Sequence, residues 1–187
     1  WTLFIFLSSN RGREGKPMDS REDRDAWLER PMEQYEESLL RMCFACLNDA
    51  AQAEDAVQET FLKAYRALDR FRGDAEEKTW LLRIAINTCR DLRRSAWFRH
   101  VDRKVTLDGL GEPASAQEWS EWDDTLTRAV MGLKPKYREA VLLCCYQWLT
   151  GQEAASVLKI SRSAVMNRLR QAKAILRKEL EVWYHGE

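Results

Sequence analysis

Proline and glycine are scarce in this chain of 187 residues, which contains only four prolines and eight glycines. Both residues punctuate turns, so their scarcity limits the number of tight connections. Little of the sequence alternates polar and apolar residues in the two-residue period of a half-buried strand. The sequence therefore predicts an all-α protein, in which helices account for the packed core.

Catalytic and metal-binding patterns are also lacking. The sequence has only two histidines, and it shows no Ser/His/Asp set, Gly-rich phosphate loop or metal-ligand spacing. Its cysteines include two close pairs, Cys43 with Cys46 and Cys144 with Cys145, but both pairs lie inside apolar helical patterns. A zinc site needs a second ligand pair at suitable spacing. We therefore expect reduced thiols, no metal, no cofactor, no small-molecule substrate and no enzymatic activity.

Long hydrophobic runs are absent as well. The apolar segment Leu3–Leu7 is too short to span a membrane and lacks the charged start of a signal peptide. We expect Met18 to be the native initiator and residues 1–25 to form a disordered extension outside the fold. An odd number of cysteines without a signal peptide favours a reducing environment, so we expect a cytoplasmic protein.

The formal net charge is zero, but the charges are unevenly distributed. Residues 18–60 contain twelve acidic and four basic side chains, and residues 105–124 contain six acidic side chains and no basic one. Residues 90–104 contain six basic and two acidic side chains, while residues 159–178 contain seven basic and no acidic ones. This distribution indicates separate surfaces for nucleic acid and for other partners.

Apolar residues at helical spacing divide the chain into two helical domains. The predicted helices span about 31–47, 49–71, 79–97, 121–132 and 135–148, followed by a helix-turn-helix. The pattern is lost in an acidic stretch with Gly109, Gly111 and Pro113, which favours a flexible linker. We therefore expect a first domain at 26–97, a linker at 98–120 and a second domain at 121–185.

The segment 149–180 reads as two helices joined by a tight turn. Thr150 can cap the first helix, with Glu153 completing a capping box, and Ser161 can cap the second. The second helix has one apolar face, made by Val165, Leu169, Ala172 and Leu176 at helical spacing. Its other side bears basic and amide groups, which is what a DNA-reading helix requires. The alternative is an ordinary surface helix with a solvated charged face.

The first domain carries a polar stripe on its second predicted helix. Asp55, Gln58, Glu59 and Leu62 are spaced so that they lie on one side of that helix, beside the apolar stripe of Val57 and Phe61. A leucine on an acidic, amide-bearing surface indicates a protein-docking patch. The alternative here is again a solvated helix face.

A loop then leads into the third predicted helix. Trp80 stands at this junction, followed by Asn87 and Arg90. Aromatic rings next to amide and guanidinium groups can stack on and hydrogen-bond to unpaired bases, and the arginines can neutralise phosphates. For Trp80, core packing is the favoured alternative, since this residue begins the apolar stripe of Trp80, Ile84, Thr88 and Leu92.

Two motifs in the first domain resemble a known family. DAVQETFLKAYRALDRFRGD, from Asp55, and TWLLRIAINTCRDLRR, from Thr79, are similar to the second region of the extracytoplasmic-function (ECF) group of bacterial sigma factors. The terminal helix-turn-helix resembles the fourth region of the same family. The resemblance covers about Met32 to Leu180 in the same order, with a linker between the two regions.

This resemblance implies a sigma factor with a region 2 helix bundle and a region 4 helix-turn-helix. Its implied partners are core RNA polymerase, promoter DNA and an anti-sigma factor, which in this family is often anchored in the membrane. The residues implied to dock on the clamp coiled coil of the largest polymerase subunit are Asp55, Gln58, Glu59 and Leu62. Those implied to capture a flipped base of the −10 element and assist strand opening are Arg72, Gly73, Asp74, Ala75, Lys78, Thr79, Trp80, Asn87 and Arg90. Those implied to read the −35 element are Arg162, Ser163, Met166, Asn167, Arg170 and Gln171.

The chain departs from the family pattern at two of its binding surfaces. Glu77 stands in the −10 loop where relatives usually have an aromatic residue, and two adjacent carboxylates disfavour single-stranded DNA electrostatically. Met166 stands where relatives commonly have Arg or Lys, so a bidentate guanine contact is excluded there. The alternative function is a helix-turn-helix regulator that does not bind core polymerase, which would leave the motifs of the first domain unexplained.

Overall fold

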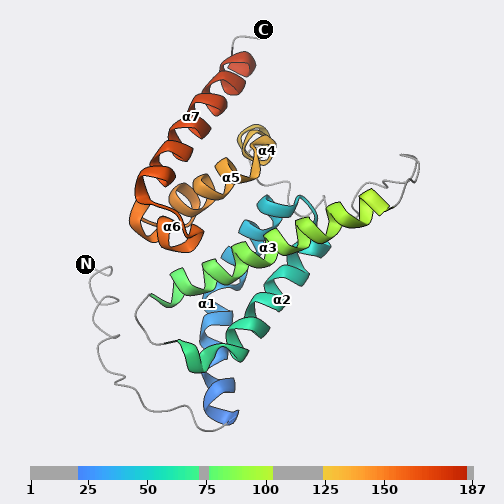
Figure 1. Ribbon diagram of the computed structural model, residues 1–187, viewed down its shortest axis with the longest axis vertical. Coiled ribbons are helices and arrows are strands. Elements are labelled where there is room, and N and C mark those ends of the chain that lie inside the picture. The colour runs from blue at the N-terminus through green and yellow to red at the C-terminus, as the bar shows by residue number, and fades with distance from the viewer. Residues whose placement is uncertain (1–20, 72–75, 103–123, 185–187) are drawn as a thin grey trace.

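The computed structural model describes residues 21–71, 76–102 and 124–184, and all its regular elements there are helical, as predicted (Figure 1). The expected extension up to residue 20, including Met18, and most of the expected linker lie outside the described residues. The first helices are α1 (Arg21–Leu47), α2 (Ala50–Arg66), the 3-10 turn η1 (Leu68–Arg70) and α3 (Glu77–Asp102). The C-terminal helices are α4 (Asp124–Gly132), α5 (Pro135–Val141), the π-helical turn η2 (Leu142–Tyr146), α6 (Gly151–Leu158) and α7 (Arg162–Tyr184).

Helix α1 begins ten residues before the predicted start at Pro31, and so includes part of the expected extension. A proline inside a helix loses one backbone hydrogen bond, but the Pro31 side chain is fully buried. The first turns of α1 are held by aromatic contacts, since the Trp27 ring lies 6.0 Å from the Trp80 ring and 6.2 Å from the Phe71 ring. These long-range contacts leave no periodic signal near residue 21.

Helix α2 follows the sequence prediction closely. Asp49 is its N-cap, and the Asp49 carboxylate accepts a 2.9 Å hydrogen bond from the backbone N–H of Gln52. The predicted apolar stripe is buried, and it consists of Val57, Phe61, Ala64 and Leu68. The helix ends at Arg66, five residues early, because the chain tightens into η1 before Phe71.

Helix α3 is buried differently from the prediction. Of the predicted stripe, Trp80, Ile84 and Leu92 are only partly buried, whereas the fully buried residues are Leu81, Leu82, Ala85, Ile86, Thr88 and Cys89. The reason is that α3 packs against α1 and α2 and also against α6, so its buried surface is wider than one stripe. Helix α3 also continues to Asp102, into the segment expected to be linker.

Three of the turns between helices share one backbone feature. Asn48, Trp148 and Lys159 each adopt a left-handed conformation, with φ between 55° and 60°. At two of these turns the next backbone N–H closes the preceding helix: Leu149 donates to the Leu143 carbonyl at 3.0 Å, and Ile160 to the Ala155 carbonyl at 3.1 Å. Such caps end a helix abruptly without a glycine, at some conformational cost.

The two predicted domains share one hydrophobic core. The same cluster of buried side chains runs from Leu39 in α1 through Ile86 in α3 to Leu143 in η2 and Leu169 in α7. Helix α3 lies along the junction, with α6 on one side of it, and α7 projects away from the first domain (Figure 1). The domains are therefore packed against each other in this arrangement.

The core packing predicts that alanine substitution destabilises the protein strongly at one leucine and little at another. Leu143 is fully buried, whereas Leu126 in α4 is 48% exposed. We expect Leu143→Ala to lower the free energy of unfolding by about 2–5 kcal/mol, because it leaves a cavity. Leu126→Ala, the matched control, should change it by less than about 1 kcal/mol. Urea denaturation followed by circular dichroism measures both, and equal losses would contradict the described packing.

Candidate nucleic-acid interface

The predicted reading face of α7 is fully presented on the surface. All six residues predicted to read the −35 element are exposed: Arg162, Ser163, Met166, Asn167, Arg170 and Gln171. On the opposite side, Val165, Leu169 and Ala172 are buried against the rest of the domain. Three of the four residues of the predicted apolar stripe are thus confirmed as buried, and Leu176 is partly buried; the stripe orients the polar residues outward.

Caps fix the start of both helices of the helix-turn-helix. The Thr150 backbone N–H donates to the Glu153 carboxylate at 2.7 Å, and the Glu153 N–H donates to Thr150 Oγ1 at 3.3 Å. These bonds form the predicted capping box, and the hydrogen bonds from Thr150 lower the pKa of Glu153. In α7 the Ala164 N–H donates to Ser161 Oγ at 3.2 Å, which confirms the second predicted cap. Each of the two helices therefore begins at a residue that is fixed by its own N-cap.

The predicted docking stripe lies on the open side of α2. Asp55 and Gln58 are exposed, Leu62 is 49% exposed, and Glu59 is partly exposed with Lys63 Nζ 3.6 Å from its carboxylate. The buried side of the same helix packs on α1 and α3. The structure thus brings the four residues together on one accessible face.

The residues predicted for the −10 element have mixed positions. Arg72, Gly73, Asp74 and Ala75 lie outside the described residues. Asn87 is exposed, Thr79 is buried, and Trp80 is half-buried, with its ring 4.8 Å from that of Phe71. Lys78 donates to the Gln147 carbonyl at 2.8 Å, and burial lowers the pKa of its ammonium group. In this arrangement the C-terminal domain thus occupies part of the predicted −10 surface.

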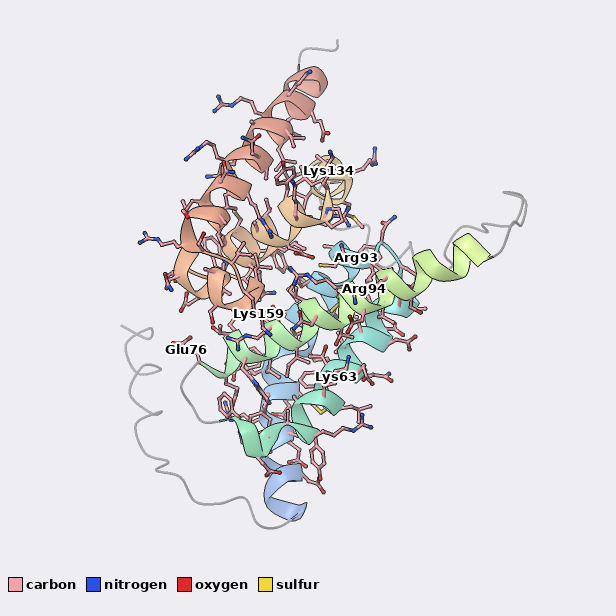
Figure 2. All side chains as sticks on the ribbon, viewed as in Figure 1. Lys63, Glu76, Arg93, Arg94, Lys134 and Lys159 are labelled. Atoms are coloured by element: carbon pink, nitrogen blue, oxygen red, sulfur yellow. The ribbon has the colours of Figure 1, made fainter. Side chains whose placement is uncertain are left out.

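Like Lys78, Arg90 is bound to the C-terminal domain, in this case through the buried carboxylate of Glu139 in α5. Arg90 donates to both oxygens of Glu139, at 3.1 and 2.7 Å, and Arg93 donates to one of them at 2.9 Å. Figure 2 labels Arg93 on the part of α3 that lies beneath the C-terminal domain. These hydrogen bonds raise the pKa of Arg90. Glu139 therefore joins the two domains by three charge-assisted bonds.

Arg138 and Gln147 also join the two domains. Together with Glu139 they form what we call the domain junction. The Arg138 guanidinium donates to the Ala45 and Cys46 carbonyls at the end of α1, both at 3.1 Å. A cation at this position satisfies carbonyls that have no partner within the helix and complements the helix dipole. Gln147 is buried and exchanges hydrogen bonds with the Ser38 side chain and backbone.

Sequence reasoning did not find the domain junction. Glu139 and Arg138 follow the N-terminal Pro135 in a short helix, where adjacent opposite charges look like a solvated surface. Neither residue belongs to a motif, and their partners in the first domain lie between 46 and 93 residues away. Only the hydrogen bonds of Glu139 to α3 and of Arg138 to α1 assign them a role.

Glu77 does not have the surroundings expected for a residue facing DNA. Its side chain is mostly buried, and one carboxylate oxygen lies 2.5 Å from the guanidinium of Arg30 in α1. Glu77 also contributes to the raised pKa of Tyr35, whose main cause is burial. The carboxylate is therefore paired within the domain, which reduces its repulsion of a nearby DNA strand.

The cysteines show no sign of a metal site. All five are free; Cys43, Cys46 and Cys89 are buried, and Cys145 is exposed. Within the described ranges, no group of three or more His, Cys, Asp or Glu residues is arranged to hold a metal ion. Nor does any helix in those ranges combine the length and apolar character needed to cross a membrane.

Comparison with known families matches both domains. Residues 32–99 match the family described as "Sigma-70 region 2", and residues 123–176 match "Sigma-70, region 4". These ranges include the docking stripe on α2, the predicted −10 residues and the reading face of α7.

Two individual proteins and one solved structure are also similar to this chain. The chain is 31% identical over 159 residues to the RNA polymerase sigma-H factor of Pseudomonas aeruginosa, covering 79% of this chain and 82% of that protein. It is 28% identical over 170 residues to the ECF RNA polymerase sigma factor SigW of Bacillus subtilis, covering 84% and 90%. The fold is similar to the sigma factor RpoE from Bartonella quintana, solved in complex with the anti-sigma factor NepR, with a TM-score of 0.70 at 22% identity, covering 82% and 96%.

The domain junction makes a testable prediction for Glu139. Glu139→Gln keeps the size of the side chain but removes the charge that two guanidinium groups share. Because both arginines are then left in a partly buried site without a counter-charge, we expect the free energy of unfolding to fall by about 2–3 kcal/mol.

Glu179→Gln is the matched control, since Glu179 is exposed on α7 and its replacement should change the free energy by less than about 0.5 kcal/mol. Urea denaturation compares the two variants. Indistinguishable stabilities would mean that Glu139 does not hold the domains together.

Proposed function

Because this chain belongs to the ECF group of the sigma-70 family of RNA polymerase sigma factors, we propose that its two domains divide promoter recognition between them. As a sigma factor it serves transcription initiation and catalyses no reaction itself. The observation that carries the division is the presence of two separate exposed faces, one on α2 and one on α7. Each face lies in the domain that matches the corresponding sigma region.

The stripe of Asp55, Gln58, Glu59 and Leu62 is proposed to dock on the clamp coiled coil of the largest subunit of core RNA polymerase. A half-exposed leucine among acidic and amide groups offers apolar contact within a polar rim. Since the opposite face of α2 is buried in the bundle, docking leaves the fold of the first domain undisturbed.

The exposed face of α7 is proposed to lie in the major groove of the −35 element. Seven basic and no acidic residues between positions 159 and 178 provide the attraction to phosphates, which stabilises the complex on any sequence. The Thr150 capping box and the Ser161 cap fix where each helix begins, and α6 packs on α7, which gives the two helices the defined arrangement that base reading requires.

The first domain is proposed to capture unpaired −10 bases, with Arg72, Gly73, Asp74, Ala75, Lys78, Thr79 and Trp80 at the loop and Asn87 and Arg90 beside it. Lys78 and Arg90 are bound to the C-terminal domain in the described arrangement. Capture of the −10 strand therefore requires the domains to separate, and we attribute that separation to engagement with core polymerase and the −35 element.

We propose the domain limits 26–97 and 121–185, with an acidic linker at 98–120 that permits this separation. We also propose a cytoplasmic location and regulation by an anti-sigma factor that holds the chain at the membrane. The RpoE structure contains an anti-sigma factor, NepR, bound to that protein. The alternative, a regulator that does not bind core polymerase, accounts for the second domain but not for the match over residues 32–99.

The docking proposal is tested by reversing charge on α2. Asp55→Arg combined with Glu59→Arg places two cations where the stripe presents carboxylates, and like charges facing each other cost several kcal/mol. We expect the affinity for core polymerase to fall by more than about 100-fold, measured by fluorescence anisotropy of the labelled sigma factor.

Glu33→Arg combined with Glu37→Arg is the matched control, because these exposed residues of α1 have the same spacing and undergo the same charge change. This control should bind core polymerase as the original chain does. Equal loss in both double variants would indicate a general charge effect and would contradict docking through α2.

A further inference from the structure

One apolar side chain interrupts the polar reading face of α7. Met166 is 47% exposed, while its neighbours on this face carry guanidinium, hydroxyl and amide groups. Isolated exposed apolar side chains are common on protein surfaces and require no special role. Met166 differs because its side chain packs at a defined place in the structure.

The Met166 side chain packs on the first turn of α6, at Gly151. A Cβ atom added to Gly151 would lie 3.3 Å from Met166 Sδ and 3.6 Å from Arg162 Cγ. The Met166 and Arg162 side chains therefore lie together over the backbone of Gly151. The capping box of Thr150 and Glu153 fixes this turn, so the platform beneath the two side chains is well defined.

The chemistry of a methionine limits what it can recognise in a major groove. Its thioether donates no hydrogen bond and accepts only weakly, so it does not satisfy the polar base edges. Thymine is the one base that presents an apolar group there, the methyl on C5. A flexible and polarisable side chain is well suited to contact such a methyl group.

The charges around Met166 favour DNA over a protein as the partner that contacts this side chain. Seven basic and no acidic residues between positions 159 and 178 create a field that attracts phosphates. Arg162, which lies over the same glycine, adds a donor beside the apolar contact.

We propose that Met166 reads the 5-methyl group of a thymine in the −35 element, with Gly151 providing the space in which the Met166 side chain lies. This inference rests on the proposed placement of α7 in the major groove. It makes Met166 a specificity-determining residue, with apolar recognition in place of a bidentate guanine contact.

The test uses the full chain bound to core polymerase and begins with selection of its preferred −35 duplex from a randomised pool. Each thymine in that duplex is then replaced by deoxyuridine, which removes only the methyl group. We expect one position at which uracil weakens binding about three- to fivefold, the loss that corresponds to one buried methyl group. At this position Met166→Ala should bind thymine and uracil equally, whereas Met166→Leu should retain the preference for thymine.

Glu179→Ala is the control, because Glu179 is exposed on the same helix outside the six reading residues and its replacement should leave the thymine-to-uracil ratio unchanged. The inference is overturned if no thymine position responds to uracil, or if Met166→Ala keeps the response. Failure to select any preferred duplex would instead count against the proposed −35 reading. The two failures are therefore distinguishable.

Discussion

Glu139 is the residue on which the arrangement of the two domains depends. A buried carboxylate is costly unless opposite charges and hydrogen bonds satisfy it, and Glu139 receives both from Arg90 and Arg93 of the other domain. Arg138, the residue before Glu139, donates hydrogen bonds to the carbonyls at the end of α1. One turn of α5 thus presents an anion to α3 and a cation to α1, and these contacts hold the C-terminal domain in place together with the shared hydrophobic core.

This junction divides the proposed binding surfaces into two kinds. The docking stripe on α2 and the reading face of α7 are exposed while the domains are together. Lys78 and Arg90 are not free in that state, because the C-terminal domain accepts their hydrogen bonds. The order we propose is therefore docking and −35 reading first, then release of the −10 surface. The energy to break the junction would come from the binding of core polymerase and DNA, as expected for a protein that catalyses no reaction.

The sequence predicted those features that arise within a single helix. The apolar stripe of α7 and the caps at Thr150 and Ser161 are local, since they depend on spacing and on side chains within three residues. The stripe of α2 was predicted for the same reason. The start of α1 and the buried surface of α3 were not, because contacts between distant segments determine them. Glu139 could not be recognised at all, since its charge becomes meaningful only beside Arg90 and Arg93.

The proposed separation of the two domains can be measured as a change in the distance between them. Spin labels introduced as non-natural amino acids at exposed Glu36 in α1 and Lys173 in α7 would report the separation of the two domains by pulsed electron paramagnetic resonance. We expect one short, narrow distance distribution in the free protein and a longer one in the complex with core polymerase and promoter DNA. The same distribution in both states would contradict it.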